Sequence, residues 1–184
     1  MERLEIDNIL KVNELNNELE FERATNIYGR LRWMVKEDNT LKPVREHLRY
    51  LIKSYEDKFW GDEEKISDKQ IQESDVAEKI VQKESEFIQR RKELIRRNIK
   101  KSGIKQKDLA EILGHRPNYM SELINGIRPF SRDDIVVIHR LFGIDFKDLI
   151  PQFLKDEMTT HIKLTLGKLK NKKVKLRIND LVKA

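Results

Sequence analysis

Residues 106–114 read Gln-Lys-Asp-Leu-Ala-Glu-Ile-Leu-Gly, and residues 117–126 read Pro-Asn-Tyr-Met-Ser-Glu-Leu-Ile-Asn-Gly. Each stretch has the pattern of a short helix that stops at a glycine, and His-Arg forms a turn between them. Ala110 is small enough to lie where two helices cross closely. Gly114 can adopt the left-handed backbone conformation that a tight turn requires. The spacing therefore predicts two short helices that cross at a tight turn.

The surrounding apolar residues predict a small helical domain over residues 76–151. Leu109, Leu113, Met120 and Leu123 can pack the two short helices together, and an apolar pattern over residues 135–149 predicts a fourth helix and a following turn. Upstream, residues 87–99 show one apolar face at helical spacing, on a helix expected to begin at Val76.

This region resembles the Xre/Cro-repressor family of DNA-binding domains over about residues 84–151. The motifs that carry the resemblance are Gln-x-x-Leu-Ala-x-x-x-Gly and Ser-x-x-x-Asn-Gly, found here at Gln106, Leu109, Ala110, Gly114, Ser121, Asn125 and Gly126. The resemblance implies a five-helix, lambda-repressor-like domain. In such domains the second helix of the pair enters the major groove of DNA.

The resemblance also implies two sets of DNA-contacting residues. Residues at the start of the second helix would read base edges, and residues around it would bind phosphates. Pro117 departs from the polar residue that many relatives carry, so one base contact is expected to be missing. The alternative for each residue is an ordinary solvated side chain. The base-reading candidates are Arg116, Asn118, Tyr119, Ser121 and Glu122, and the phosphate-binding candidates are Gln106, Lys107, Asn125, Arg128 and Arg132.

Charge is distributed unevenly along the 184 residues, whose formal net charge is +6. Residues 1–80 carry a net charge of −5 and residues 81–184 a net charge of +11. A basic domain beside an acidic one suggests a polyanionic partner for the basic part. The alternative is a soluble basic surface without a partner.

Residues 1–60 are expected to form a helical hairpin or a small helical domain. Apolar residues recur at helical spacing between Ile9 and Val35, with a break expected near Phe21. Thr40 and Pro43 are suited to start a second helix, which should end near Gly61. Residues 61–75 are polar and are interpreted as a linker.

The combination of these two parts resembles HigA-type antitoxins of toxin–antitoxin systems over about residues 20–151. The motifs are Leu-Ile-x-x-Tyr-Glu at residues 51–56 and Ser-Glu-x-x-Asn-Gly-x-Arg-Pro at residues 121–129. The resemblance implies a protein that neutralises a small basic RelE-like toxin and represses its own operon. An acidic, amphipathic helical segment could bind such a basic partner. The alternative is that the candidate partner-binding residues pack the hairpin's own core; these are Leu48, Ile52, Tyr55, Phe59 and Trp60.

Residues 152–184 form a basic tail. Apolar and basic residues alternate over residues 161–166 and 174–178, which predicts a β-hairpin with its turn at residues 171–172. Such a hairpin could add to the sheet of a partner, or it could pack locally or form a dimer. A cationic arm along DNA phosphates is a further alternative.

No enzyme, cofactor or metal is expected. The four histidines are isolated, there is no glycine-rich phosphate loop, and the absence of cysteine excludes disulfides and thiolate metal sites. No apolar run is long enough to span a membrane, and the start lacks the apolar run of a signal peptide, so a cytoplasmic protein is expected. We therefore expect a mainly α-helical antitoxin and autorepressor that binds palindromic double-stranded operator DNA as a homodimer. The alternatives are a stand-alone transcriptional regulator and a protein-interaction module with a non-functional DNA-binding helix pair.

Overall fold

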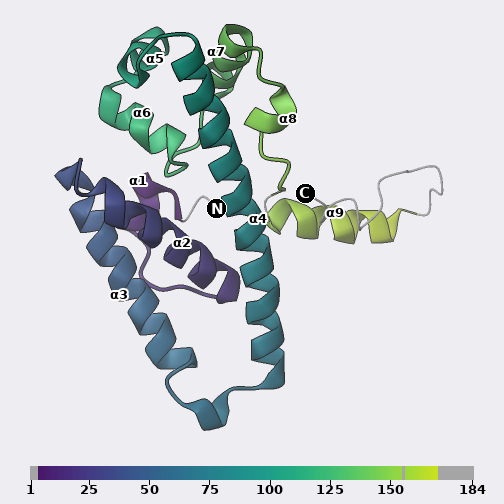
Figure 1. Cartoon of the computed structure of the whole chain (residues 1–184). Coiled ribbons are helices and arrows are strands. Elements are labelled where there is room, and N and C mark those ends of the chain that lie inside the picture. Colours follow the sequence, from purple (N-terminus) through teal and green to yellow (C-terminus); the bar gives the residue numbers. More distant parts are fainter. Residues whose placement is uncertain (1–3, 155, 170–184) are drawn as a thin grey trace.

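One long helix, α4 (Asp68–Lys101), connects the helices that precede it with those that follow it (Figure 1). The computed structural model describes residues 4–154 and 156–169, and every regular element in these two ranges is helical. The prediction of a mainly α-helical protein is therefore confirmed. The elements before α4 are α1 (Ile6–Ile9), α2 (Glu18–Met34), η2 (Asn39–Leu41), α3 (Lys42–Phe59) and η3 (Glu63–Lys65); those after it are α5 (Gln106–Ile112), α6 (Pro117–Ile124), α7 (Arg132–Phe142), α8 (Phe146–Leu149) and α9 (Asp156–Lys168).

Helix α4 begins earlier than the sequence pattern indicated. The side chain of Ser67 caps its start by accepting a hydrogen bond of 3.2 Å from the backbone of Gln70. Most of the segment expected to be a linker, from Asp68 onward, is thus helical. The polar first turns bury only a narrow stripe, Ala77 and Val81, so they lack the broad apolar face that marks most helices.

The N-terminal lobe, residues 4–60, contains α1, α2, η2 and α3 around a core of its own. The expected break lies between α1 and α2, where residues 12–16 are non-helical, and α2 runs through Phe21 without interruption. Asn17 caps α2, while Val12 and Leu15 reach the core from the irregular segment. As expected, α3 has Pro43 in its first turn and ends at Phe59.

The helix-turn-helix region consists of α5 and α6 against the C-terminal part of α4, with α7 and α8 closing the core. Gly114 has a φ of +71°, the left-handed conformation predicted for the turn. The core is shared by all five helices and includes Ile95, Leu109, Met120, Ile138 and Leu149, each 1% exposed or less. The expected five-helix domain is therefore present.

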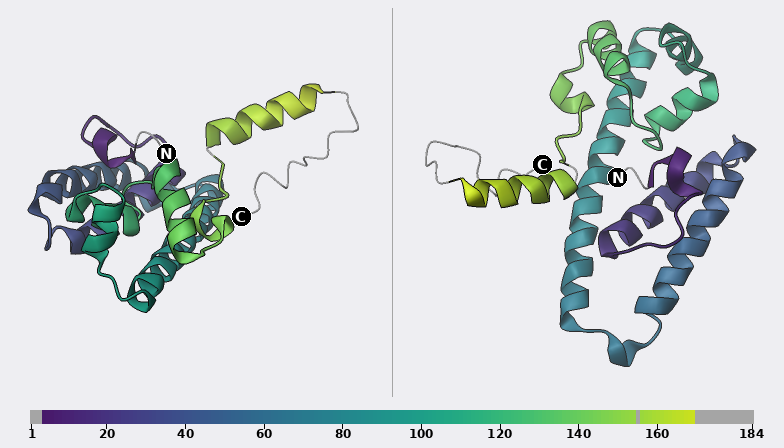
Figure 2. Two further views of the ribbon diagram at one scale, coloured as in Figure 1. Left: turned by 90° about the horizontal axis from the view of Figure 1, so that it is seen from above. Right: turned by 180° about the vertical axis from the view of Figure 1, so that it is seen from behind.

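The C-terminal prediction of a β-hairpin is wrong where it can be compared. Residues 161–166, expected as its first strand, lie inside α9, which projects from the body of the molecule (Figure 2). The expected turn and second strand, residues 171–178, lie outside the described residues. Met158, Ile162 and Leu166 also recur every fourth residue, so the segment that alternates with period two equally matches a helix.

Candidate nucleic-acid interface

Helix α6 presents one face to the core and another to the surface. Met120, Leu123 and Ile124 are fully buried, which fixes the orientation of the helix. Pro117 occupies the first helical turn, where its missing N–H costs no hydrogen bond. The outward side therefore carries the candidate base-reading residues at the start of the helix.

Three of those candidates are exposed: Arg116, Asn118 and Tyr119. The Tyr119 ring lies 5.0 Å from the ring of His115 in the preceding turn. His115 in turn hydrogen-bonds Asp134 at the start of α7, with 2.8 Å between Nε2 and Oδ1. The turn between α5 and α6 is thus tied to the rest of the domain, which holds the start of α6 in place. Sequence reasoning did not assign this positioning contact to His115.

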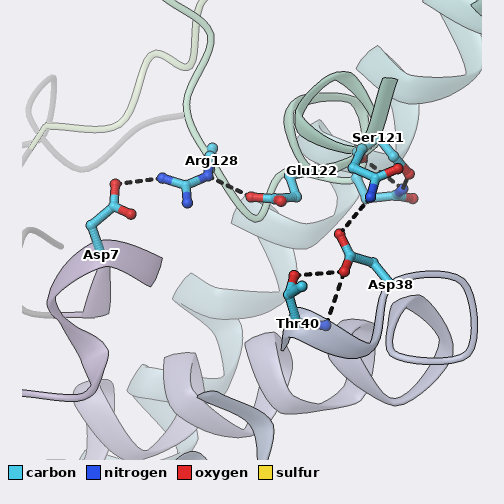
Figure 3. A network of polar contacts seen from close by, with 8 residues as sticks. Asp7, Asp38, Thr40, Ser121, Glu122 and Arg128 are labelled. Carbon is cyan, nitrogen blue, oxygen red and sulfur yellow. Dashed lines mark hydrogen bonds and ion pairs between the residues drawn. The ribbon is translucent and has the colours of Figure 1, made fainter. Parts of the chain in front are cut away.

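Asn118 is exposed, but its side-chain amide already forms a hydrogen bond. Its Nδ2 donates a hydrogen bond of 2.9 Å to Oδ2 of Asp38, which belongs to the N-terminal lobe. The other oxygen of Asp38 accepts from the hydroxyl and the backbone N–H of Thr40 (Figure 3). These hydrogen bonds from Thr40, and then that from Asn118, lower the pKa of Asp38, so the carboxylate is charged.

Ser121 in α6 pairs with Asn125, the residue that caps the end of this helix. The Asn125 amide donates to the Ser121 carbonyl at 2.8 Å and lies 3.3 Å from its hydroxyl. Both residues are half-buried. A contact of either with DNA would compete with this local hydrogen bonding.

Glu122 does not face the surface, so its prediction as a base-reading residue is corrected. The residue is 7% exposed, and its carboxylate accepts a hydrogen bond from Nε of Arg128. Helical periodicity places Glu122 on the same side of α6 as Tyr119, three residues earlier, but Arg128 of the following loop pairs with its carboxylate.

Arg128, a candidate phosphate-binding residue, is held between two carboxylates. Its guanidinium donates to Glu122 and to Asp7 of the N-terminal lobe (Figure 3). Burial alone would lower the pKa of Arg128, but the hydrogen bonds to Asp7 and Glu122 outweigh it and raise that pKa. The bond from Arg128 lowers the pKa of Asp7. Among the other phosphate-binding candidates, Lys107 and Arg132 are exposed and Gln106 is half-buried.

The candidate partner-binding residues lie mostly in the core of the N-terminal lobe. Leu48 is fully buried and Tyr55 is 5% exposed, so their prediction as partner contacts is corrected. The Tyr55 hydroxyl donates to Glu18 at 3.0 Å, and its ring stacks on Phe21. Ile52 and Trp60 are half-buried against the same core, and Phe59 is 39% exposed. These residues are apolar at helical spacing because they pack α3 against α2.

Sequence reasoning missed the contact between the two lobes. Asp7, Arg30 and Asp38 reach residues 80 to 121 positions away in the sequence. Ile127, in the loop after α6, is packed into the core cluster of the N-terminal lobe. No local pattern signals such pairs, because each residue looks like an ordinary surface side chain in its own segment.

Neither a metal site nor a membrane span is found in the described part of the chain. Residues 4–154 and 156–169 contain no group of histidine and acidic side chains that could hold a metal ion. In the same ranges, no helix combines the length and apolar character needed to cross a bilayer.

Comparison with known proteins identifies the domain that contains α6. A family model described as helix-turn-helix matches residues 95–149. Neither the curated proteins nor the solved structures gave a match. The matched range covers the end of α4 and all of α5 to α8. Residues 95–149 are therefore similar to a helix-turn-helix family, in agreement with the arrangement of α5 and α6.

Proposed function

We propose that the protein is a transcriptional regulator that binds double-stranded DNA by placing α6 in the major groove. The observation that carries the proposal is the arrangement of α6: a fully buried inner face fixes the helix, and its N-terminal residues are exposed. The helix-turn-helix match supports DNA binding. The net charge of +11 over residues 81–184 favours a polyanion on this side of the chain.

The exposed residues suggest separate roles in such a complex. Asn118 has the amide that pairs with adenine, and Arg116 has the guanidinium that pairs with guanine. Lys107 and Arg132 have the charge and exposure of phosphate-binding residues. Two copies of the domain on a palindrome would double these contacts, and we include a homodimer in the proposal.

The test is quantitative binding to duplexes taken from the DNA upstream of the protein's own gene. Asn118→Ala should relax the base preference at one position, costing about 1–3 kcal/mol on the preferred sequence. Arg132→Ala should weaken binding to all sequences alike and reduce the salt slope by about one. Lys69→Ala, on the far end of α4, is the matched control for loss of a cation. Wild-type behaviour of both α6-side variants would refute this assignment of the interface.

We further propose that the regulator is an antitoxin of the HigA type whose N-terminal lobe binds a small basic toxin. Exposed aromatic side chains on the N-terminal lobe support this second candidate: Trp33 is 70% exposed, Tyr50 64% and Phe59 39%. Aromatic residues are enriched in the centres of protein interfaces. The proposal includes repression of its own operon and no catalytic activity of its own.

Co-expression tests the antitoxin proposal. The product of the adjacent small basic reading frame should arrest growth alone and be neutralised by this protein. Trp33→Ser and Tyr50→Ser should weaken the rescue, while Tyr119→Ser in the helix-turn-helix domain should leave it intact. DNA binding without rescue would favour a stand-alone regulator, and rescue without DNA binding would favour an interaction module.

A further inference from the structure

We propose that the N-terminal lobe holds the helix-turn-helix domain in a closed state that competes with DNA, through two carboxylates that occupy DNA-contacting groups. The inference rests on the proposed function, because it concerns regulation of the same α6 surface. The two carboxylates are Asp38 and Asp7, and the contact they form is called the acidic clamp below.

The first half of the acidic clamp engages the start of α6. Asp38 accepts a hydrogen bond of 2.9 Å from the Asn118 amide, the same group that would donate to adenine. Asp38 is held in place by Thr40, whose hydroxyl and backbone N–H donate to it at 2.6 and 3.0 Å. A base edge that pairs with the Asn118 amide would therefore compete with Asp38 for it.

The second half engages the loop after α6. Arg128 donates to Asp7, whose side chain is 73% exposed, and to Glu122, whose side chain is 10% exposed. The guanidinium also lies 5.1 Å from the ring of Tyr119. Its charge is therefore already compensated by two carboxylates, and a DNA phosphate would have to replace Asp7.

The clamp is reinforced by packing at the end of α6. Ile127 is 7% exposed and joins the core of the N-terminal lobe. Arg30 Nη1 donates to the Gly126 carbonyl at 3.2 Å. A groove of about 450 Å³ lies beside this contact, lined by residues of α2 and α4, among them Trp33 and Lys92, and by Asn125 just after α6. Apolar packing and a hydrogen bond thus accompany the two carboxylates at the contact.

The net charge of the N-terminal lobe is close to zero. Residues 4–60 carry 10 basic and 11 acidic side chains, a net charge of −1, and the lobe stands beside α6 (Figure 1). Competition with DNA phosphates therefore rests on Asp7 and Asp38 themselves and not on the overall charge of the lobe. In the open state the N-terminal lobe no longer contacts α6. A partner that binds the lobe more tightly in the open state than in the closed state would shift the equilibrium toward DNA binding by that difference in affinity.

The experiment compares the wild type with the double variant Asp7→Ser/Asp38→Ser on an upstream duplex at fixed salt. Serine can keep the hydrogen bond to the Thr40 backbone, but it is uncharged and too short to reach Asn118. We expect binding to tighten by about tenfold, the middle of the range for coupling between sites. The control, Glu63→Ser/Glu64→Ser, changes the charge equally in η3, at the far end of α3 (Figure 1).

Each outcome decides the inference. Tighter binding by the clamp variant than by the control supports the clamp. Equal binding by the wild type and both variants overturns the acidic clamp while leaving the proposed function intact. An equal gain in both variants also overturns it, because the gain would then come from the change in net charge alone. If no version binds any duplex, the proposed function fails and the clamp fails with it. Asp7→Ser alone, at an exposed side chain, gives the same comparison if the double variant does not fold.

Discussion

The N-terminal lobe and the helix-turn-helix domain are built on the same helix, α4, but by different means. The helix-turn-helix domain has short helices separated by glycines in the left-handed conformation, at Gly103, Gly114, Gly126 and Gly143. The N-terminal lobe has two long helices and an irregular segment whose course depends on burial of Val12 and Leu15. Local backbone signals therefore define one region, whereas tertiary packing defines the other.

The largest expected effect tests whether the two regions fold as one unit. Leu123→Ala, in the helix-turn-helix core, and Leu31→Ala, in the N-terminal lobe, remove side chains that are fully buried. Each should lower the free energy of unfolding by about 2–5 kcal/mol. Because α4 packs against α2 of the N-terminal lobe and is itself part of the helix-turn-helix region, we expect a single calorimetric transition that both variants shift. Two transitions, each moved by one variant only, would show that the regions unfold independently.

A smaller effect separates local backbone strain from contact between the regions. Gly114→Ala should cost about 1–2 kcal/mol, because φ is +71° but no atom lies within 4 Å of the new Cβ. Gly126→Ala should cost about 1–3 kcal/mol more, because its Cβ would lie 2.5 Å from Ile88 Cγ2 of α4 and 3.2 Å from Arg30 Nη1 of the N-terminal lobe. Chemical denaturation measures both. The control is Gly29→Ala inside α2, where space is open and alanine should stabilise by about 0.5–1 kcal/mol. Equal costs at positions 114 and 126 would mean that Ile88 and Arg30 do not crowd Gly126.

The smallest effect is a pH dependence confined to the N-terminal lobe. Burial raises the pKa of Glu18 above 4.5, despite the hydrogen bond from Tyr55. The folded lobe therefore binds the proton more tightly than the unfolded chain does. This contribution to stability is complete below pH 4.5 and is lost as the pH rises through the pKa of folded Glu18. Glu18→Gln should thus gain thermal stability relative to the wild type as the pH rises from 4.5 to 7.

Matched variants make the pH experiment specific. Glu56→Gln, on the exposed side of α3, should show no such gain between the same pH values. A constant difference between Glu18→Gln and the wild type at every pH would contradict a raised pKa of Glu18. Global effects of other carboxylates cancel, because the measurement is a difference between two chains.

Sequence reasoning was most accurate where the determinants are local. The predicted stops at Gly114 and Gly126 lie two residues after the ends of α5 and α6, and the Ala110 and Gly114 pattern correctly placed the tight turn. It was less accurate where the secondary structure depends on packing with residues that are distant in the sequence. The start of α4 was placed too late, since its first turns bury few apolar side chains. The strand expected at residues 161–166 is helical, since two periodicities share the same apolar residues.

The sequence by itself determined the helix-turn-helix domain, the helical class and the division of charge between the two halves. It did so because helix stops, tight turns and charge are written in consecutive residues. Only the tertiary structure decided that Glu122 and Tyr55 are buried and that Asp7 and Asp38 meet Arg128 and Asn118. Those facts depend on which surfaces pack together across about a hundred residues. No local pattern encodes that arrangement.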